Sequence, residues 1–376
     1  MAQQASNESN QPKPTKHIDV EDLRLNYDPE NPQERFKAAG VASAFLSASE
    51  RLPSMVPWPA ATKPTPEPLS TTPPDSEDLT KFKGYDAVVV TWTSAEAAAL
   101  AALCTPGFKV SQWYEYRHNV DSYIPLVTGN RAPFNDKQAD MARYYHSLGL
   151  YFPCRIGKAR VLLMKSGLHL DYDGPKYPLR KMVTEVVQAV EPKLFITTGT
   201  GGGIGADVSL GDVIIAGHTK FHCVTQFKSE PWATTSYPAS PLPAGAISAI
   251  TPALTKVNAS KVKGGRPVPK MWDTAQDTIV TTDFFGFDDS TNHYKLQGLG
   301  QACDMGDAMV GNALQQFPKV KWHAIRNASD PQIPNPSNNI EEAKQEAGKI
   351  YAAYGAFTTA ASVIATWAVI QASFGH

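Results

Sequence analysis

Cysteine is scarce in this sequence, and there is no excess of basic residues. Its four cysteines lie far apart and form no Cys-x-x-Cys pair, which argues against a zinc ribbon or a disulfide scaffold and favours a reducing compartment. The formal net charge is −1 at pH 7, so the chain lacks the overall basic field with which proteins hold nucleic acid. We therefore expect a cytoplasmic protein without a nucleic-acid partner.

Targeting and membrane-spanning signals are also missing. Residues 1–14 read MAQQASNESNQPKP and contain no apolar run, so we expect no secretory signal there. Residues 351–375 are long enough to span a bilayer, but threonine, serine, glutamine and small alanines dilute their apolar character. We expect a buried or subunit-interface helix in this stretch and no membrane contact.

Proline divides the chain into two parts. Residues 1–80 are polar and rich in proline, which removes backbone donors and favours extended chain. We predict a proline-rich N-terminal arm with one short helix that begins near Asn31, followed by a catalytic domain over residues 81–376. The arm is either a flexible linker or a segment that wraps the body through side chains such as Trp58. Because it lies outside the domain, we expect its removal up to Asp75 to leave the fold intact.

Short apolar strands alternate with helical stretches beyond the arm, which predicts a layered α/β/α domain. Strands are expected at 87–91, 159–167, 193–199, 212–217, 277–283 and 321–330. Helices are expected from residue 94 and at 136–150, 178–192, 303–317 and 339–371. Residues 109–133, rich in aromatic residues and asparagine, are expected to form a loop or an insertion.

A glycine-rich run, ITTGTGGGIGADVSLGDVII, occupies residues 196–215. Its letters fit the dinucleotide-binding pattern, but the chain returns to a strand within a few residues and leaves no room for the helix that this motif requires. No Gly-Lys-Ser/Thr follows, so it is no Walker loop. We expect the backbone of Thr200, Gly201 and Gly202 to contact a ligand. A tight turn between two strands is the equally open structural alternative.

Three further segments accompany this run in a fixed order: DAVVVTWTSAEAAAL, ACDMGDAMVGNAL and HAIRNASD. With these four segments the chain resembles the nucleoside phosphorylase and methylthioadenosine/S-adenosylhomocysteine nucleosidase superfamily over residues 85–374. The resemblance implies a three-layer α/β/α sandwich with a central mixed sheet, no cofactor, a small-molecule nucleoside substrate and a homo-oligomer, dimer or higher.

The resemblance assigns two acidic residues to catalysis. Cleavage of a purine N-glycosidic bond passes through an oxocarbenium-like sugar and requires protonation of the leaving base. By resemblance Asp330 is this acid, oriented by Ser329, and burial would raise its pKa. Glu96 would position the attacking water. The alternatives are a helix N-cap at the Ser-Asp pair and a solvated first-turn acid at residue 96.

The remaining substrate contacts also come from the resemblance. Gly306 stands where the family has a glutamate that holds the sugar, so we expect Asp304 or Asp307 to supply this contact, with Met305 packed on the sugar. Phe285 would stack on the purine, and His169 would lie near the sugar. The alternatives are that Met305 is a core residue and that His169 is a structural histidine; Phe284, the neighbour of Phe285, could be a core residue.

The sequence favours hydrolysis over phosphorolysis. Many phosphorylases place an arginine where this chain has Thr197, and the first loop, TWTSAEA, contains none either. His218, His222 and Cys223 lie in a strand-like stretch at spacings that we interpret as different faces, so we expect no metal site. We therefore predict a nucleosidase. Phosphorolysis and a non-catalytic nucleoside-binding protein remain alternatives, and a nicotinamide oxidoreductase is a remote one.

Overall fold

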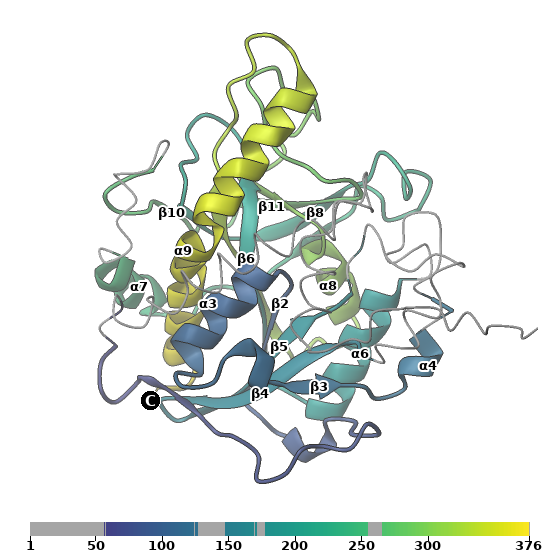
Figure 1. Ribbon diagram of the computed structural model, residues 1–376, viewed down its shortest axis with the longest axis vertical. Helices are drawn as coiled ribbons and strands as arrows, with labels where there is room; N and C mark the ends of the chain where they lie inside the picture. The colour runs from purple at the N-terminus through teal and green to yellow at the C-terminus, as the bar shows by residue number, and fades with distance from the viewer. Residues whose placement is uncertain are drawn as a thin grey trace, which may run out of the picture.

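One mixed β-sheet organises the part of the chain that the computed structural model describes, namely residues 56, 58–123, 125–126, 147–168, 170, 177–254 and 265–375 (Figure 1). The sheet order is β1-β4-β5-β2-β6-β12-β11-β8-β9; β13 pairs with β6 and β7, β10 with β7, and β3 with β4. The strands are β1 (Pro64–Pro66), β2 (Ala87–Thr91), β3 (Tyr114–Tyr116), β4 (Gly149–Ile156), β5 (Ala159–Ser166), β6 (Leu194–Gly203), β7 (Val213–Ile215), β8 (His218–His222), β9 (Ser236–Pro238), β10 (Met271–Trp272), β11 (Thr278–Thr282), β12 (Ala302–Asp304) and β13 (Lys321–Asp330).

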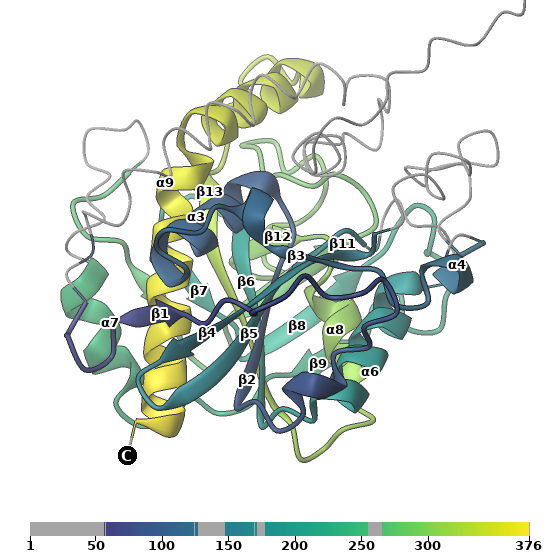
Figure 2. The ribbon, with the colours of Figure 1, turned by 60° about the horizontal axis from the view of Figure 1, so that its bottom comes forward.

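The helices lie in two layers, one on each face of this sheet. They are α3 (Ser94–Cys104), α4 (Val120–Tyr123), α6 (Pro178–Val190), α7 (Ala246–Leu254), α8 (Asp307–Leu314) and α9 (Ile340–Phe374), with 3-10 turns η3 (Thr80–Phe82) and η4 (Val110–Gln112). Alternation along β2 separates the layers, since Val88 and Val90 share a buried cluster with α6 and α8, whereas Ala87 and Val89 pack with α3 and α9. Figure 2 shows α6 and α8 on one side and α7 and α9 on the other. The three-layer prediction is confirmed.

Helix α9 explains the weakly apolar run near the C-terminus. Its polar residues bond to the protein core, because Ser362 Oγ donates to Asn327 Oδ1 at 2.8 Å and Thr366 Oγ1 donates to Thr198 Oγ1 at 2.9 Å. The run is therefore a buried helix packed on β6 and β13. Within the described ranges, no helix combines the length and the apolar character needed to cross a bilayer.

The described part of the N-terminal segment wraps the body. β1 pairs antiparallel with β4, the rings of Trp58 and Trp367 lie 4.9 Å apart, and the backbone N–H of Leu69 donates to the Tyr114 hydroxyl at 2.7 Å. Removal up to Asp75 would thus delete an edge strand. The helix expected near Asn31 lies outside the described residues.

The first part of the glycine run belongs to strand β6, and residues 204–212 form the connection from β6 to β7. β6 continues through Gly203 and is paired on both sides, with Gly201 opposite Ala328 of β13 and Gly202 opposite Cys303 of β12. A Cβ atom at Gly201 would lie 2.9 Å from the Cys303 carbonyl oxygen. The missing side chains therefore let two neighbouring strands approach closely.

Three element predictions need correction. The expected helix over 136–150 ends in β4, because residues 149 and 150 pair with β5; residues 136–146 lie outside the described ranges. The expected loop over 109–133 contains η4, β3 and α4. The expected helix over 303–317 begins only at Asp307, because Cys303 and Asp304 belong to β12.

Candidate active site

The candidate site lies where the carboxyl ends of three parallel strands meet. β6 is parallel to both β2 and β13, so Thr91, Gly203 and Asp330, which end these strands, lie at one edge of the sheet. α3 begins directly beyond β2. This edge collects both acidic residues that the sequence places in catalysis, Glu96 and Asp330.

Asp330 is a buried carboxyl group with one unengaged oxygen. The residue is 7% exposed, and its Oδ1 accepts a hydrogen bond from Ser329 Oγ at 2.8 Å. No described group bonds to its Oδ2. Burial raises the pKa of Asp330 to about 7; the Ser329 hydrogen bond opposes this rise and the negative charge of Asp288 adds to it. A large fraction of Asp330 is therefore protonated at neutral pH.

Neither Ser329 nor Asp330 caps a helix. The next helix, α9, begins ten residues after Asp330, and its N-cap is Asn339, whose side chain accepts from the Glu342 N–H. The helix-cap alternative for the Ser-Asp pair is thus excluded, and Ser329 instead orients the Asp330 side chain.

Glu96 is buried rather than solvated, at 1% exposure. Its Oε2 accepts hydrogen bonds from Thr91 Oγ1 at 2.8 Å, Trp92 N at 2.8 Å and Thr93 N at 2.9 Å. Its Oε1 accepts from Thr200 N at 2.7 Å and from Thr200 Oγ1 at 2.6 Å. Two oxygens thus receive five hydrogen bonds, which uses the full acceptor capacity of a carboxylate. The amide that was expected to face a ligand, that of Thr200, faces Glu96.

Gly199 leaves the space that the Glu96 carboxylate occupies. Its φ angle is +148°, which L side chains rarely adopt, and a Cβ atom built there would lie 2.3 Å from the Glu96 carboxyl carbon. Glycine at this position of β6 therefore allows a carboxylate from α3 to lie against the strand.

Arg326 joins three carboxylates at the centre of the site. Its Nε donates to Asp307 Oδ2 at 2.8 Å and its Nη2 to Asp307 Oδ1 at 2.6 Å. Nη2 also donates to Asp304 Oδ2 at 3.2 Å, and Nη1 lies 3.7 Å from Glu96 Oε1. The guanidinium lies 4.8 Å from the centre of the Trp92 ring. Burial lowers the pKa of Arg326, but Asp307 and Asp304 outweigh burial and raise it above its ordinary value.

The two candidate sugar-binding acids are both engaged by the protein. Asp304 Oδ1 accepts from Thr281 Oγ1 at 2.6 Å, and its Oδ2 accepts from the Gly306 and Asp307 N–H groups at 2.9 and 2.7 Å. Burial and the neighbouring Asp307 charge raise the pKa of Asp304 to about 7 against the lowering effect of Arg326. Asp304 is 8% exposed, whereas Asp307 is fully buried.

The residue at 306 is small because an indole ring lies beside it. A Cβ atom there would approach Trp92 Cζ2 to 3.0 Å, and Trp92 Nε1 is fixed by a hydrogen bond to the Leu168 carbonyl at 2.8 Å. Trp92 thus occupies space into which a side chain at 306 would extend.

Comparison with protein families decides the assignment. The family model described as the phosphorylase superfamily matches residues 130–356. The chain belongs to this superfamily. The matched range includes Arg326 and Asp330 but not Glu96. The search of curated proteins returned no match.

Solved structures with a similar fold include two 5′-methylthioadenosine/S-adenosylhomocysteine nucleosidases and one futalosine hydrolase. The Neisseria meningitidis nucleosidase with methylthio-immucillin-A is 16% identical (TM-score 0.47; 76% of this chain and 99% of that one). The Colwellia psychrerythraea nucleosidase with adenine is 15% identical (TM-score 0.48; 77% and 96%). The futalosine hydrolase of Helicobacter pylori is 13% identical (TM-score 0.46; 76% and 98%).

In this member of the phosphorylase superfamily, the other predicted contacts are placed as follows. Gly202 adjoins Asp330, since a Cβ atom there would lie 3.3 Å from Asp330 Oδ2. Met305 is half-buried, and its carbonyl accepts from the Leu170 N–H at 3.2 Å. Phe285 is half-buried against an apolar cluster that includes Phe287. His169 lies outside the described residues.

No group of three or more histidine, cysteine, aspartate or glutamate side chains in the described ranges could hold a metal ion. The reasoning about faces was wrong, however, because His218 and His222 lie four residues apart in β8 and share one face. Their rings point to different partners: His218 Nδ1 lies 3.0 Å from the Ala275 carbonyl and His222 Nε2 lies 3.3 Å from the Tyr294 carbonyl.

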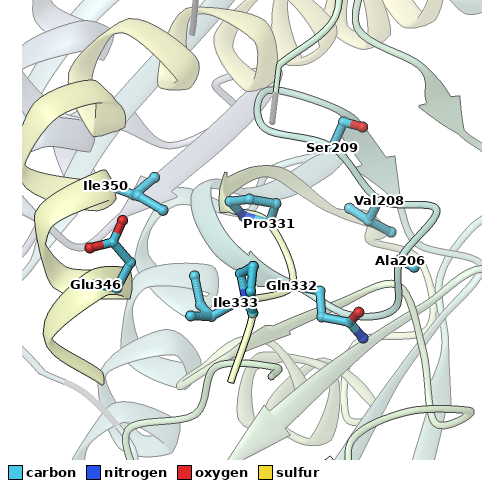
Figure 3. A pocket seen from close by; sticks show the side chains of 9 residues that line it. Ala206, Val208, Ser209, Pro331, Gln332, Ile333, Glu346 and Ile350 are labelled. Atoms are coloured by element: carbon cyan, nitrogen blue, oxygen red, sulfur yellow. The ribbon is translucent and has the colours of Figure 1, made fainter. Parts of the chain in front are cut away.

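A cavity of about 320 Å³ adjoins the end of β13. It begins at Pro331, the residue after Asp330, and is bounded by the β6–β7 loop and by α9 (Figure 3). Val208 and Ser209 line one side, and Glu346 and Ile350 line the other. The superfamily member therefore has an accessible hollow next to the segment that carries its candidate acid.

Sequence reasoning missed four residues of the site or gave them no role: Trp92, Asp288, Arg326 and Tyr351. Arg326 had one usable signal, because it lies on the same strand as Asp330. Tyr351 donates from α9 to Thr93 Oγ1 at 2.8 Å, a contact 258 residues apart in sequence that no local pattern reports.

Proposed function

We propose that this protein cleaves the N-glycosidic bond of a purine nucleoside or a related nucleoside by hydrolysis. The observation that carries this proposal is Asp330, a buried carboxyl group with a pKa of about 7 and one oxygen that no described group engages. Such a group can donate a proton at neutral pH. Membership of the phosphorylase superfamily supports the same class of substrate.

In the proposed reaction, the bond between C1′ of the sugar and N9 of the purine breaks, and its electron pair moves to the base. Asp330 transfers its proton to N7 as this charge develops, which makes the base a better leaving group. A water oxygen bonds to C1′ and releases one of its protons to solvent. The products are the free purine and the free sugar, and Asp330 regains its proton from solvent.

We further propose that Glu96 positions this water through Thr200. The Thr200 hydroxyl donates to Glu96 Oε1 at 2.6 Å, so its oxygen lone pairs remain available to accept a hydrogen bond from the water. Thr200 is 9% exposed and Glu96 only 1%, which supports an indirect role for the glutamate. Of the two candidate sugar-binding acids, the greater exposure of Asp304 favours Asp304 over Asp307.

The charge around Arg326 favours hydrolysis over phosphorolysis. An attacking phosphate needs a site that is positive overall, whereas Arg326 is surrounded by Glu96, Asp304 and Asp307. Three carboxylates around one guanidinium leave this cluster negative when all are ionised, and a negative cluster repels a phosphate anion.

The test is purine release from a panel of ribonucleosides, with and without phosphate. We expect release without phosphate, and a fall of about 10²–10⁴-fold in turnover for Asp330→Asn, which keeps the shape but cannot protonate N7. Binding of free purine, measured by calorimetry, should persist in this variant.

Asp86→Asn is the matched control, because Asp86 precedes β2 at the opposite end of that strand and bonds to the Arg160 N–H and to Lys193. Its turnover should equal that of the wild type. Absence of purine release by the wild type refutes the activity, and release that depends on phosphate reassigns the protein to phosphorolysis. An Asp330→Asn variant with full turnover removes Asp330 from the mechanism.

A further inference from the structure

Asp288 is a buried carboxylate beside the candidate acid. It is 1% exposed. Its Oδ2 accepts hydrogen bonds from the Gly205 N–H and from Gln332 Nε2, both at 2.8 Å. Its Oδ1 accepts from Gln297 Nε2 at 3.0 Å. All three donors are neutral amides.

These hydrogen bonds connect the segment that follows β6 to the segment that follows β13. Gly205 lies two residues beyond the end of β6, and Gln332 lies two residues beyond Asp330. The Asp288 carbonyl also accepts from the Ile333 N–H at 2.9 Å. Figure 3 shows Gln332 and Ile333 in the connection after β13, next to the cavity. Asp288 therefore bonds to the backbone of both segments, at Gly205 beyond β6 and at Ile333 beyond β13.

The charge of Asp288 has no cationic partner in the described part of the chain, where the ion pairs involve other carboxylates. Amide donors stabilise a carboxylate but do not cancel its charge. A buried, uncancelled negative charge acts over several ångströms, because the protein interior screens it less than water does. A neighbouring carboxyl group then favours its neutral form.

We propose that Asp288 is a positioning residue for Asp330: it ties together the segments that follow β6 and β13, and it places a negative charge near the Asp330 carboxyl group, which favours the neutral form of that group. The effect of Asp288 on proton donation to a substrate rests on the proposed nucleosidase function. Its effect on the protonation of Asp330 does not, because that is a property of the free protein.

Burial is the largest cause of the raised pKa of Asp330, and among the neighbouring groups Asp288 acts in the same direction. On its own strand, the Ser329 hydroxyl donates to Asp330 Oδ1 and favours the ionised form. Cys303 of β12 is buried and Tyr351 of α9 is half-buried; desolvation raises the pKa of each above its ordinary value, so both are neutral at pH 7. Asp288 is the neighbouring charge that favours the protonated form of Asp330.

The main experiment is the pH dependence of kcat for purine release in Asp288→Asn and Asp288→Glu. Without the charge, Asp330 should lose its proton at lower pH, so the fall of kcat at high pH, the high-pH limb, should begin at lower pH. We expect a loss of about 3- to 10-fold in kcat at pH 8 and little change at pH 5.5. KM should stay near its wild-type value. Asp288→Glu keeps the charge and should keep the wild-type limb.

Asp289→Asn is the matched control. Asp289 is the adjacent buried acid, but its bonds go to Thr291, the His293 N–H and Asn335, so its loss should leave the limb in place. If Asp288→Asn fails to fold, Gln332→Lys offers a second route, because an ammonium group beside Asp288 cancels the charge without removing the carboxylate. Its neutral counterpart is Gln332→Met.

A second measurement separates this inference from the proposed function. Carboxyl ¹³C NMR of aspartate-labelled protein, with the Asp330 signal assigned from Asp330→Asn, follows the Asp330 titration without any turnover. We expect a lower midpoint in Asp288→Asn and Gln332→Lys than in the wild type. If the wild type releases no purine but the two variants show the lower midpoint, the nucleosidase function is refuted and the role of Asp288 stands. An active wild type whose variants keep both midpoint and limb overturns the role of Asp288.

Discussion

Replacement of Glu96 by glutamine tests whether this residue is a structural centre of the site. The amide group of glutamine must put an NH₂ where one carboxylate oxygen now accepts hydrogen bonds. At the Oε2 position it would face two backbone donors, the N–H groups of Trp92 and Thr93. At the Oε1 position it would face only one, that of Thr200, since the Thr200 hydroxyl can rotate and accept. The second orientation is therefore the less costly one.

The cost follows from this geometry. One buried backbone N–H without an acceptor costs about 1–3 kcal/mol, and Arg326 loses a charged neighbour at 3.7 Å. We expect Glu96→Gln to lower the free energy of unfolding by about 2–4 kcal/mol, and Tm by roughly 3–5 °C. Turnover should fall as well, and added phosphate should not restore it.

Urea unfolding followed by tryptophan fluorescence measures the loss. The control is Glu67→Gln, because Glu67 forms a partly exposed ion pair with Arg155, and such pairs contribute only about 0–1 kcal/mol. If Glu96→Gln unfolds at the wild-type urea concentration, the hydrogen bonds of Glu96 do not stabilise the fold, and the reasoning fails.

Two further predictions concern the sheet around the site. Gly199→Ala should lower the free energy of unfolding by about 3 kcal/mol or more, because its Cβ would lie 2.3 Å from the Glu96 carboxyl carbon at a φ of +148°. The control is Gly298→Ala, at a φ of +82° with no atom within 4 Å. It should lower the free energy of unfolding by only about 1 kcal/mol in the same assay. Burial lowers the pKa of His323 to about 4, so the folded protein keeps this ring neutral while the unfolded chain binds a proton below pH 6.5; about 3 kcal/mol of stability should be lost between pH 6.5 and 4. His323→Gln should remove that part of the pH dependence in unfolding experiments, and an unchanged pH profile would show that His323 is not its source.

The layered fold was predictable because its central strands carry a strong local signal. Residues 87–91 and 321–330 are strands over the ranges that the sequence indicates. β4 was missed because Pro153 interrupts it, and proline argues against a strand. The glycine run was missed because glycine has no strand preference of its own; pairing with β12 and β13 imposes the extended form.

The site was predictable as a set of residues but not as a set of contacts. A short motif at a strand end suggested Asp330 and Glu96 as chemical groups. The same motifs could not show that Glu96 is saturated with hydrogen bonds or that Arg326 lies between three carboxylates, because those contacts join segments far apart in sequence. Asp288 lies in a polar stretch that reads as an ordinary turn, so nothing local distinguishes it from Asp289.

Helix α9 also sets a constraint on insertions and deletions. Tyr351 bonds to Thr93 at the site, while Ser362 and Thr366 bond to the central strands. One helix thus spans the distance between the core and the site loop, and its bonding residues must keep a common rotational phase. An insertion of a single residue between Tyr351 and Ser362 would turn the site end by about 100° and shift it by about 1.5 Å. The number of residues between Tyr351 and Ser362 is therefore fixed, even where the side chains between them tolerate substitution.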